Sequence, residues 1–353
     1  MPSFVSRRTT LGLFATLAIA ATCTQCSGPS GPIDGDKAMA HVKAQVAFGP
    51  RPFGSDALAK TTDYLEGELK KLGLSPQRHE VMHDKEKKTI RNLYVQIDGE
   101  DPKAGPILML GAHYDTKLAE GHTGADAQHN FRFVGAIDGG GGPAVLLELA
   151  RALKDRTPKP KCNVWLYWID AEESIDWVWA PNSQRALLGS KAFCKKLSED
   201  KTLSRVKAFV LLDLVGSKDF KVDKDGRSET RLMTIVEKAA AAMGATDRVY
   251  QFPTPLEIEN LKRHARENNR PEAWGITDDH NVFTDYGVPS VLLIDFERRI
   301  PGTPQALPKT DFHQWWHTAE DDLPAMDPDA LAFYGNLVMQ AFPDLEAFVM
   351  GRK

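Results

Sequence analysis

Short apolar runs that alternate with helical patterns constrain the fold of this chain more than any other feature. The runs are bounded by turn residues and are continuously apolar, which is typical of strands buried on both faces. They cover residues 93–97, 107–110, 164–169, 208–212 and 288–294, and helical spacing covers 58–72, 143–153, 187–197, 229–243 and 330–348. The alternation predicts an α/β fold, a single-domain sandwich with a central, mainly parallel or mixed β-sheet flanked by helices.

The first 26 residues have the pattern of an export signal. Arg7 and Arg8 precede an apolar stretch, 11–21, that is too short to cross a bilayer as a stable helix. The arginine pair resembles a twin-arginine address, and Cys23 or Cys26 offers a site for a lipid anchor as the alternative to simple cleavage. We therefore expect an exported protein, periplasmic or secreted, with a membrane-anchored lipoprotein as the alternative. Residues 27–37 would form a linker and residues 38–353 one α/β domain.

Charge and cysteine content exclude several other classes of protein. Lys and Arg number 44 against 48 Asp and Glu, a formal net charge of −4, so the chain lacks the basic surface that nucleic-acid binding needs. Beyond the signal only Cys162 and Cys194 remain, which is too few for a disulfide framework. We expect both thiols to be buried and free.

Acidic and imidazole side chains follow nearly every predicted strand. In α/β sheets ligands bind outside the carboxyl ends of the strands, so we expect these side chains to converge at one edge. They are His113 and Asp115 after 107–110, Asp138 after a strand-like run at 133–136, Asp170, Glu172 and Glu173 after 164–169, Asp213 after 208–212, and later Asp278, Asp279, His280 and His317, the last of which follows Trp315 and Trp316. Each alone is typical of a cap or a turn. Together they supply the oxygen and nitrogen ligands that zinc prefers.

Seven short segments resemble the zinc peptidases of family M28. They are GPRPFGS (49–55), GAHYDTK (111–117), VGAIDG (134–139), DAEE (170–173), LLGSKAF (187–193), DDHNVF (278–283) and WHT (316–318). Within that family the chain is similar to the glutaminyl cyclases (glutaminyl-peptide cyclotransferases), through LLDLVG (211–216), the doubled Asp278-Asp279, and Trp316 directly before His317. The resemblance implies a zinc-dependent acyltransferase that converts the N-terminal Gln of peptides or proteins to pyroglutamate and releases ammonia. We expect it to act as a monomer.

The resemblance also implies roles for individual residues. One Zn²⁺ with an open fourth position, as in catalytic zinc sites, would be held by Asp138, Glu173 and His317. The proton would be carried by Glu172, with Asp213 and Asp279 as an acidic pair hydrogen-bonded to it. The substrate pocket would be walled by Trp316 and by either Trp177 or Trp179.

Two alternatives use the same scaffold. In the first, an M28-type aminopeptidase hydrolyses N-terminal residues with two metal ions: Asp138 bridges them, His113 and Asp213 hold the second ion, and Glu172 activates a bridging water. The aminopeptidases resembled here usually carry Asp-Asp where this chain has Asp138-Gly139, which favours the cyclase. The second alternative is an inactive binding module on the same fold, which the retained Glu172 and the three presumed ligands argue against.

Overall fold

The computed structural model describes residues 31–179, 184–251, 263, 275–296 and 315–352. The predicted export signal, residues 1–26 with Cys23 and Cys26, lies outside the described residues. Within the described part of the chain, no helix combines the length and the apolar character needed to cross a membrane.

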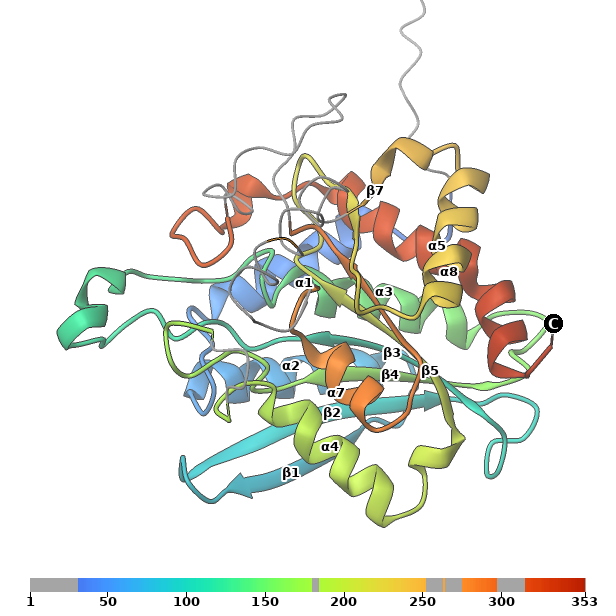
Figure 1. Cartoon of the computed structure of the whole chain (residues 1–353), viewed down its shortest axis with the longest axis horizontal. Helices are drawn as coiled ribbons and strands as arrows, with labels where there is room; N and C mark the ends of the chain where they lie inside the picture. Colours follow the sequence, from blue (N-terminus) through green and yellow to red (C-terminus); the bar gives the residue numbers. More distant parts are fainter. Residues whose placement is uncertain (1–30, 180–183, 252–262, 264–274, 297–314, 353) are drawn as a thin grey trace, which may run out of the picture.

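A mixed eight-stranded sheet forms the centre of the molecule (Figure 1). The strands are β1 (Gln77–His83), β2 (Lys88–Ile97), β3 (Ile107–His113), β4 (Asn163–Ile169), β5 (Val206–Asp213), β6 (Val222–Lys224), β7 (Val249–Gln251) and β8 (Ser290–Ile294). They lie in the order β1-β2-β4-β3-β5-β8-β6-β7, and β4, β3, β5 and β8 are parallel neighbours. Every residue of β3, β4 and β8 is buried, as expected for parallel strands covered on both faces.

Helices cover both faces of this sheet (Figure 1). One face carries α1 (Gly35–Ala47), α3 (Gly141–Lys154), α5 (Thr230–Ala242) and α8 (Pro328–Val349), and the other carries α4 (Leu188–Glu199) and α7 (Asp279–Asp285). Helix α2 (Asp56–Lys71) packs against β2 and α3. It ends where the sequence predicts, because Gly73 takes the left-handed conformation with φ of 77°. The predicted α/β sandwich with a mixed sheet is confirmed.

The first and last helices pack against each other. Ahead of α1, the backbone N–H of Ile33 donates to Asn336 Oδ1 of α8 at 3.2 Å. The Asp34 side chain then caps α1 by accepting from the backbone N–H of Lys37 at 3.1 Å. Helix α1 therefore begins inside the range 27–37 that the sequence suggests as a linker, and the folded domain starts before residue 38.

Two expectations about strands need correction. Strands β1, β6 and β7 were not predicted, because β1 is largely exposed and polar and the other two have three residues each. The strand-like run at 133–136 is irregular in the structure. Its carbonyls at Val134 and Gly135 accept hydrogen bonds from the Arg51 side chain. By contrast, the prediction of free, buried thiols at Cys162 and Cys194 is confirmed.

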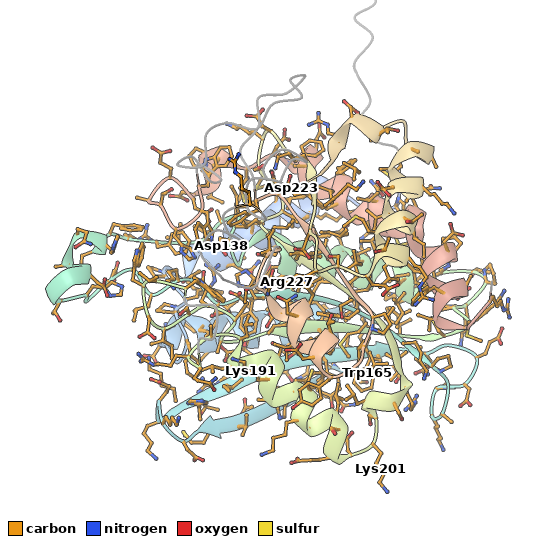
Figure 2. All side chains as sticks on the ribbon, viewed as in Figure 1. Asp138, Trp165, Lys191, Lys201, Asp223 and Arg227 are labelled. Atoms are coloured by element: carbon orange, nitrogen blue, oxygen red, sulfur yellow. The ribbon has the colours of Figure 1, made fainter. Side chains whose placement is uncertain are left out.

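A long segment follows β3 and carries the short 3₁₀ helix η1 (Gly124–His129), which projects from the body of the molecule (Figure 1). Its base is closed by a backbone hydrogen bond from Phe131 N–H to Ala119 O at 2.9 Å. Asp138 lies on the side of the molecule from which this segment projects (Figure 2). The side chains that carry chemistry gather there.

Candidate active site

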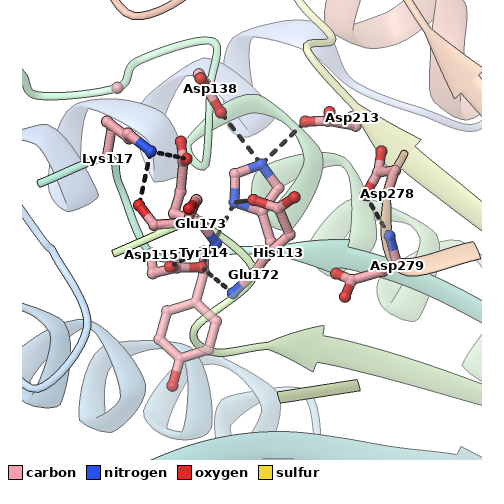
Figure 3. Close-up of polar contacts among 12 residues, drawn as sticks. His113, Tyr114, Asp115, Lys117, Asp138, Glu172, Glu173, Asp213, Asp278 and Asp279 are labelled. Atoms are coloured by element: carbon pink, nitrogen blue, oxygen red, sulfur yellow. Dashed lines mark hydrogen bonds and ion pairs between the residues drawn. The ribbon is translucent and has the colours of Figure 1, made fainter. Parts of the chain in front are cut away.

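The carboxyl ends of three neighbouring parallel strands place the site. His113 is the last residue of β3 and Asp213 the last of β5, while Glu172 and Glu173 follow β4. Asp138 comes from the irregular segment before α3 and reaches the same place, so that His113 lies between Asp138 and Asp213 (Figure 3). The convergence at one edge of the sheet that the sequence predicts is therefore present.

One group of potential ligands contains Asp138, Glu173 and His317. One ligand atom from each lies within 4.8 Å of the other two. His317 Nε2 is 3.0 Å from Glu173 Oε1 and 3.6 Å from Asp138 Oδ2. Asp138 Oδ2 and Glu173 Oε2 are buried and have no hydrogen-bond partner among the described residues, which is costly unless a cation compensates. Two carboxylates and one imidazole fit zinc with an open coordination position.

The charge states of this group also suit a metal ligand set. Burial alone would raise the pKa of Glu173, but the neighbouring His317 and Lys117 outweigh it and lower that pKa to about 2. Burial lowers the pKa of His317 and so favours the neutral imidazole. An ionised carboxylate and a neutral imidazole are the forms that bind metals.

A second group shares Asp138 and adds His113 and Asp213. Their ligand atoms also lie within 4.8 Å of one another. His113 Nε2 is 2.9 Å from Asp213 Oδ1 and 3.2 Å from Asp138 Oδ1. Burial alone would lower the pKa of His113, but the surrounding carboxylates raise it well above its ordinary value. The structure thus contains both ligand sets that the sequence analysis considered, joined at one aspartate.

Glu172 is buried beside these groups, with Oε2 3.8 Å from His113 Nδ1. Burial raises its pKa well above the usual range, and the negative charges of Glu173, Asp278 and Asp279 raise it further. A carboxyl group with a raised pKa is suited to taking up and releasing a proton near neutral pH.

The hydrogen bonds expected from Asp213 and Asp279 to Glu172 are not formed among the described residues. The carboxylate of Asp213 binds His113 instead, and that of Asp279 accepts a hydrogen bond from the hydroxyl of Ser190 in α4. Asp279 still influences Glu172 through its charge, and burial raises the pKa of Asp279 to about 7. His280 lies apart from this cluster and pairs with Asp225 at 3.1 Å.

Two tryptophans flank His317. The ring of Trp316 stacks on it with centroids 4.3 Å apart and an interplanar angle of 26°. The ring of Trp177 is tilted at 5.9 Å from it and stacks on His129 of the projecting segment at 4.0 Å. Trp179 packs on the hydrophobic core, with its ring centroid 5.8 Å from Lys117 Nζ, and Trp177 is the candidate whose ring contacts the presumed ligand His317.

Sequence reasoning named Asp115 among the converging side chains but assigned no role to it, and it missed the other residues that hold the loops of the site. Asp115 accepts hydrogen bonds from the backbone N–H groups of both Glu172 and Glu173, at 3.1 and 3.2 Å. Lys117 is fully buried and donates to two carbonyls of the next turn, at Ser174 (2.6 Å) and Asp176 (2.9 Å). Both lie in the segment GAHYDTK, so the motif contained a signal for them. Arg51 and Asp321 bind the backbone around Asp138, and nothing in the local sequence marks Asp321.

Comparisons with known proteins agree on the scaffold. The profile of peptidase family M28 matches residues 92–342. A glutaminyl-peptide cyclotransferase of Drosophila melanogaster is 26% identical over an alignment of 233 residues, which covers 64% of this chain and 58% of that protein. The chain thus spans less than two thirds of the length of the first curated relatives that it matches.

Solved structures are similar over a larger part of their chains. A glutaminyl cyclase from an Acidobacteriales bacterium superposes with a TM-score of 0.69 at 25% identity, covering 94% of this chain and 99% of that one. A Zn-dependent exopeptidase from Parabacteroides distasonis superposes with a TM-score of 0.61 at 26% identity, covering 87% and 97%. The profile match extends over most of the described domain and includes all three presumed ligands. The chain belongs to peptidase family M28.

Proposed function

We propose that this protein is a glutaminyl-peptide cyclotransferase, which converts the N-terminal Gln of peptides or proteins to pyroglutamate. The observation that carries the proposal is the position of Glu172, a buried carboxyl that directly precedes the presumed ligand Glu173 and has its Oε2 3.8 Å from His113 Nδ1. The similarity to glutaminyl cyclases over nearly the whole length of one solved structure supports it.

In this proposal Asp138, Glu173 and His317 hold one zinc ion. When bound, zinc acts as a Lewis acid on the side-chain amide oxygen of the substrate glutamine. The α-amine of that residue attacks its own side-chain amide carbon, a carbon–nitrogen bond forms to close the ring, and the bond to the amide nitrogen breaks. Glu172 takes one proton from the attacking amine and returns it to the departing nitrogen, which leaves as ammonia. No water is consumed.

The surroundings of Glu172 suit a small, neutral and flat side chain. Trp316 and Trp177 both have their aromatic rings next to His317, and an amide can pack against such rings. Asp279 and Asp278 each have one buried carboxylate oxygen that has no hydrogen-bond partner within the part of the chain that the structure describes. Such oxygens can accept hydrogen bonds from the amine and amide of the substrate. We assign Asp213 and Asp279 to this acidic surrounding of the proton carrier.

An M28-type aminopeptidase with two metal ions is the second candidate. The observation that favours it is the second trio, His113, Asp138 and Asp213, which could hold another ion. Against it, position 139 cannot carry a second aspartate without rearrangement. Gly139 has φ of +88°, and a Cβ there would meet the backbone oxygen of Asp115 at 2.0 Å.

Two peptides and a metal analysis separate these functions. The purified protein is incubated with a Gln-initiated and a Leu-initiated peptide, and the products are identified by mass spectrometry. Loss of ammonia from the first peptide, far above its rate with Glu172→Gln, supports the cyclase, and one zinc per chain is expected. Release of free leucine without catalysed loss of ammonia would establish the aminopeptidase instead. A protein that binds the Gln-initiated peptide but converts neither of the two peptides would be an inactive binding module.

We also propose that the protein is exported and acts as a monomer in the periplasm or outside the cell. The support for export is the charged and apolar pattern of residues 1–26. Mass spectrometry of the N-terminus after expression in a bacterial host distinguishes the two forms of processing. A lipid on Cys23 or Cys26 indicates an anchored lipoprotein, and an unmodified new terminus indicates cleavage.

A further inference from the structure

The segment that carries Asp138 has no regular structure, yet two buried charged side chains bind its backbone. Arg51 donates through Nη1 to the carbonyl of Val134 at 2.8 Å and through Nη2 to that of Gly135 at 2.9 Å. From the other direction, Asp321 accepts from the N–H groups of Ile137 (2.7 Å) and Asp138 (3.0 Å). Carbonyls and amides of one short loop are thus held by opposite charges.

Burial makes these hydrogen bonds necessary for both charged side chains. Arg51 is 0% exposed and Asp321 is 1% exposed, so neither charge is well solvated. A buried charge is tolerated only where hydrogen bonds and opposite charges surround it. The loop itself has little freedom, because Gly135 has φ of +51° and a Cβ there would lie 2.1 Å from the carbonyl oxygen of Asp138. The loop is therefore expected to keep one conformation while both side chains are in place.

Asp321 also belongs to the turn that carries His317. Its own N–H donates to the carbonyl of Thr318 at 3.2 Å, and the N–H of Thr318 donates to the carbonyl of Trp315 at 3.1 Å. His317 sits inside this compact turn in the left-handed conformation, with φ of +53°. One residue is therefore built into the turn of one presumed ligand and bound through its side chain to the backbone of another.

We propose that Asp321 is a positioning residue of the metal centre, which together with Arg51 holds Asp138 at the spacing from His317 that one ion requires. The inference rests on the proposed assignment of Asp138, Glu173 and His317 as ligands. It adds a residue that contacts neither the ion nor the substrate. Groups that orient metal ligands in this way typically change metal affinity by about 10- to 100-fold when they are replaced.

The test is Asp321→Asn with Asp322→Asn as its matched control. The amide can accept at only one of its two terminal atoms, so one of the bonds to Ile137 and Asp138 is lost. Asp322 is the adjacent aspartate, and its side chain accepts from the N–H of Leu323 in its own turn at 2.7 Å. The zinc dissociation constant, measured by competition with a chromophoric chelator, is expected to rise about 10- to 100-fold in Asp321→Asn and to stay unchanged in the control.

A second readout separates positioning from simple stabilisation. The visible absorption of the cobalt-substituted protein reports ligand geometry, and its bands at saturating cobalt should change in Asp321→Asn but not in Asp322→Asn. Arg51→Lys keeps the positive charge but loses the two planar guanidinium donors, so it should also weaken zinc binding. This variant replaces Asp321→Asn in the test if Asp321→Asn does not fold. Reduced stability of the metal-free protein with unchanged zinc affinity and an unchanged cobalt spectrum would overturn the proposal.

The outcome does not depend on which reaction the enzyme performs. If the wild type binds zinc but does not cyclise glutamine, the proposed function fails while the affinity comparison still decides the role of Asp321. If the wild type cyclises glutamine and Asp321→Asn binds zinc as tightly as the wild type does, only the positioning role is overturned. A wild-type protein without affinity for zinc would overturn both.

Discussion

Replacing Gly139 by alanine tests how tightly the ligand loops are packed. The residue has φ of +88°, and a Cβ would lie 2.0 Å from the backbone oxygen of Asp115. The left-handed backbone alone costs an alanine about 1–2 kcal/mol. The close contact adds to this, because a backbone oxygen cannot swing aside as a side chain can. Asp115 also accepts hydrogen bonds from the N–H groups of Glu172 and Glu173. A shift of Asp115 therefore disturbs the loop that carries Glu173 as well as the loop that carries Asp138.

Gly73→Ala is the matched control, because Gly73 has a similar φ of +77° but nothing within 4 Å of its Cβ position. It should lower the free energy of unfolding by about 1–2 kcal/mol, whereas Gly139→Ala should lower it by more than about 4 kcal/mol. Urea denaturation of the metal-free proteins, followed by circular dichroism, measures both values, and Gly139→Ala should also weaken zinc binding. Equal losses in the two variants, with zinc affinity intact in Gly139→Ala, would refute the packing argument.

Three further predictions concern the ligands, the proton carrier and a hydrogen bond outside the site. His317→Ala should lose zinc and activity together while far-ultraviolet circular dichroism stays native, and stoichiometric zinc in the variant would remove His317 from the ligands. Glu172→Gln should keep zinc and lower kcat by at least about 10²-fold. Loss of zinc from this variant with only a small change in kcat would instead make Glu172 a zinc ligand and Glu173 the proton carrier. Burial alone would raise the pKa of Asp225, but the hydrogen bond with His280 lowers it. The stability that ionised Asp225 contributes is fully present above its pKa in the unfolded chain, about 3.9. That contribution is lost as the pH falls through the lower pKa of Asp225 in the folded protein. The difference in unfolding free energy between wild type and Asp225→Asn should therefore shrink below about pH 4, and a constant difference would contradict it.

The sequence predicts the buried centre of the sheet well and its edges poorly. Strands β3, β4, β5 and β8 each contain a continuous apolar run, as expected for strands that helices cover on both faces, and such runs are recognisable without further context. Strand β1 lies at the edge, is largely exposed, and shows no apolar period. It exists because β2 offers it a partner, which is a property of the assembled sheet.

A similar limit applies to the site. The presumed ligands follow strands, so topology alone brings them together. The residues that hold the loops act on backbone groups far along the chain: the bond from Arg51 to Val134 spans 83 residues, and that from Ile137 to Asp321 spans 184. A backbone N–H or carbonyl has no residue identity, so the sequence cannot indicate which side chain binds it. The wrong expectation at 133–136 has the same origin, because its apolar residues resemble a strand while Arg51 binds the carbonyls.

The contact between α1 and α8 has a consequence for how the protein is made. Helix α8 ends at Val349 and covers both α1 and strands β3 and β5, which are synthesised much earlier. At a synthesis rate of about 5–20 residues per second, the whole chain takes roughly 20 to 70 seconds to complete. Until then the apolar surfaces of α1 and α3 lack their partner on the growing chain. The nascent protein is therefore expected to depend on chaperones that shield these surfaces, and chains that terminate before α8 should aggregate or be degraded.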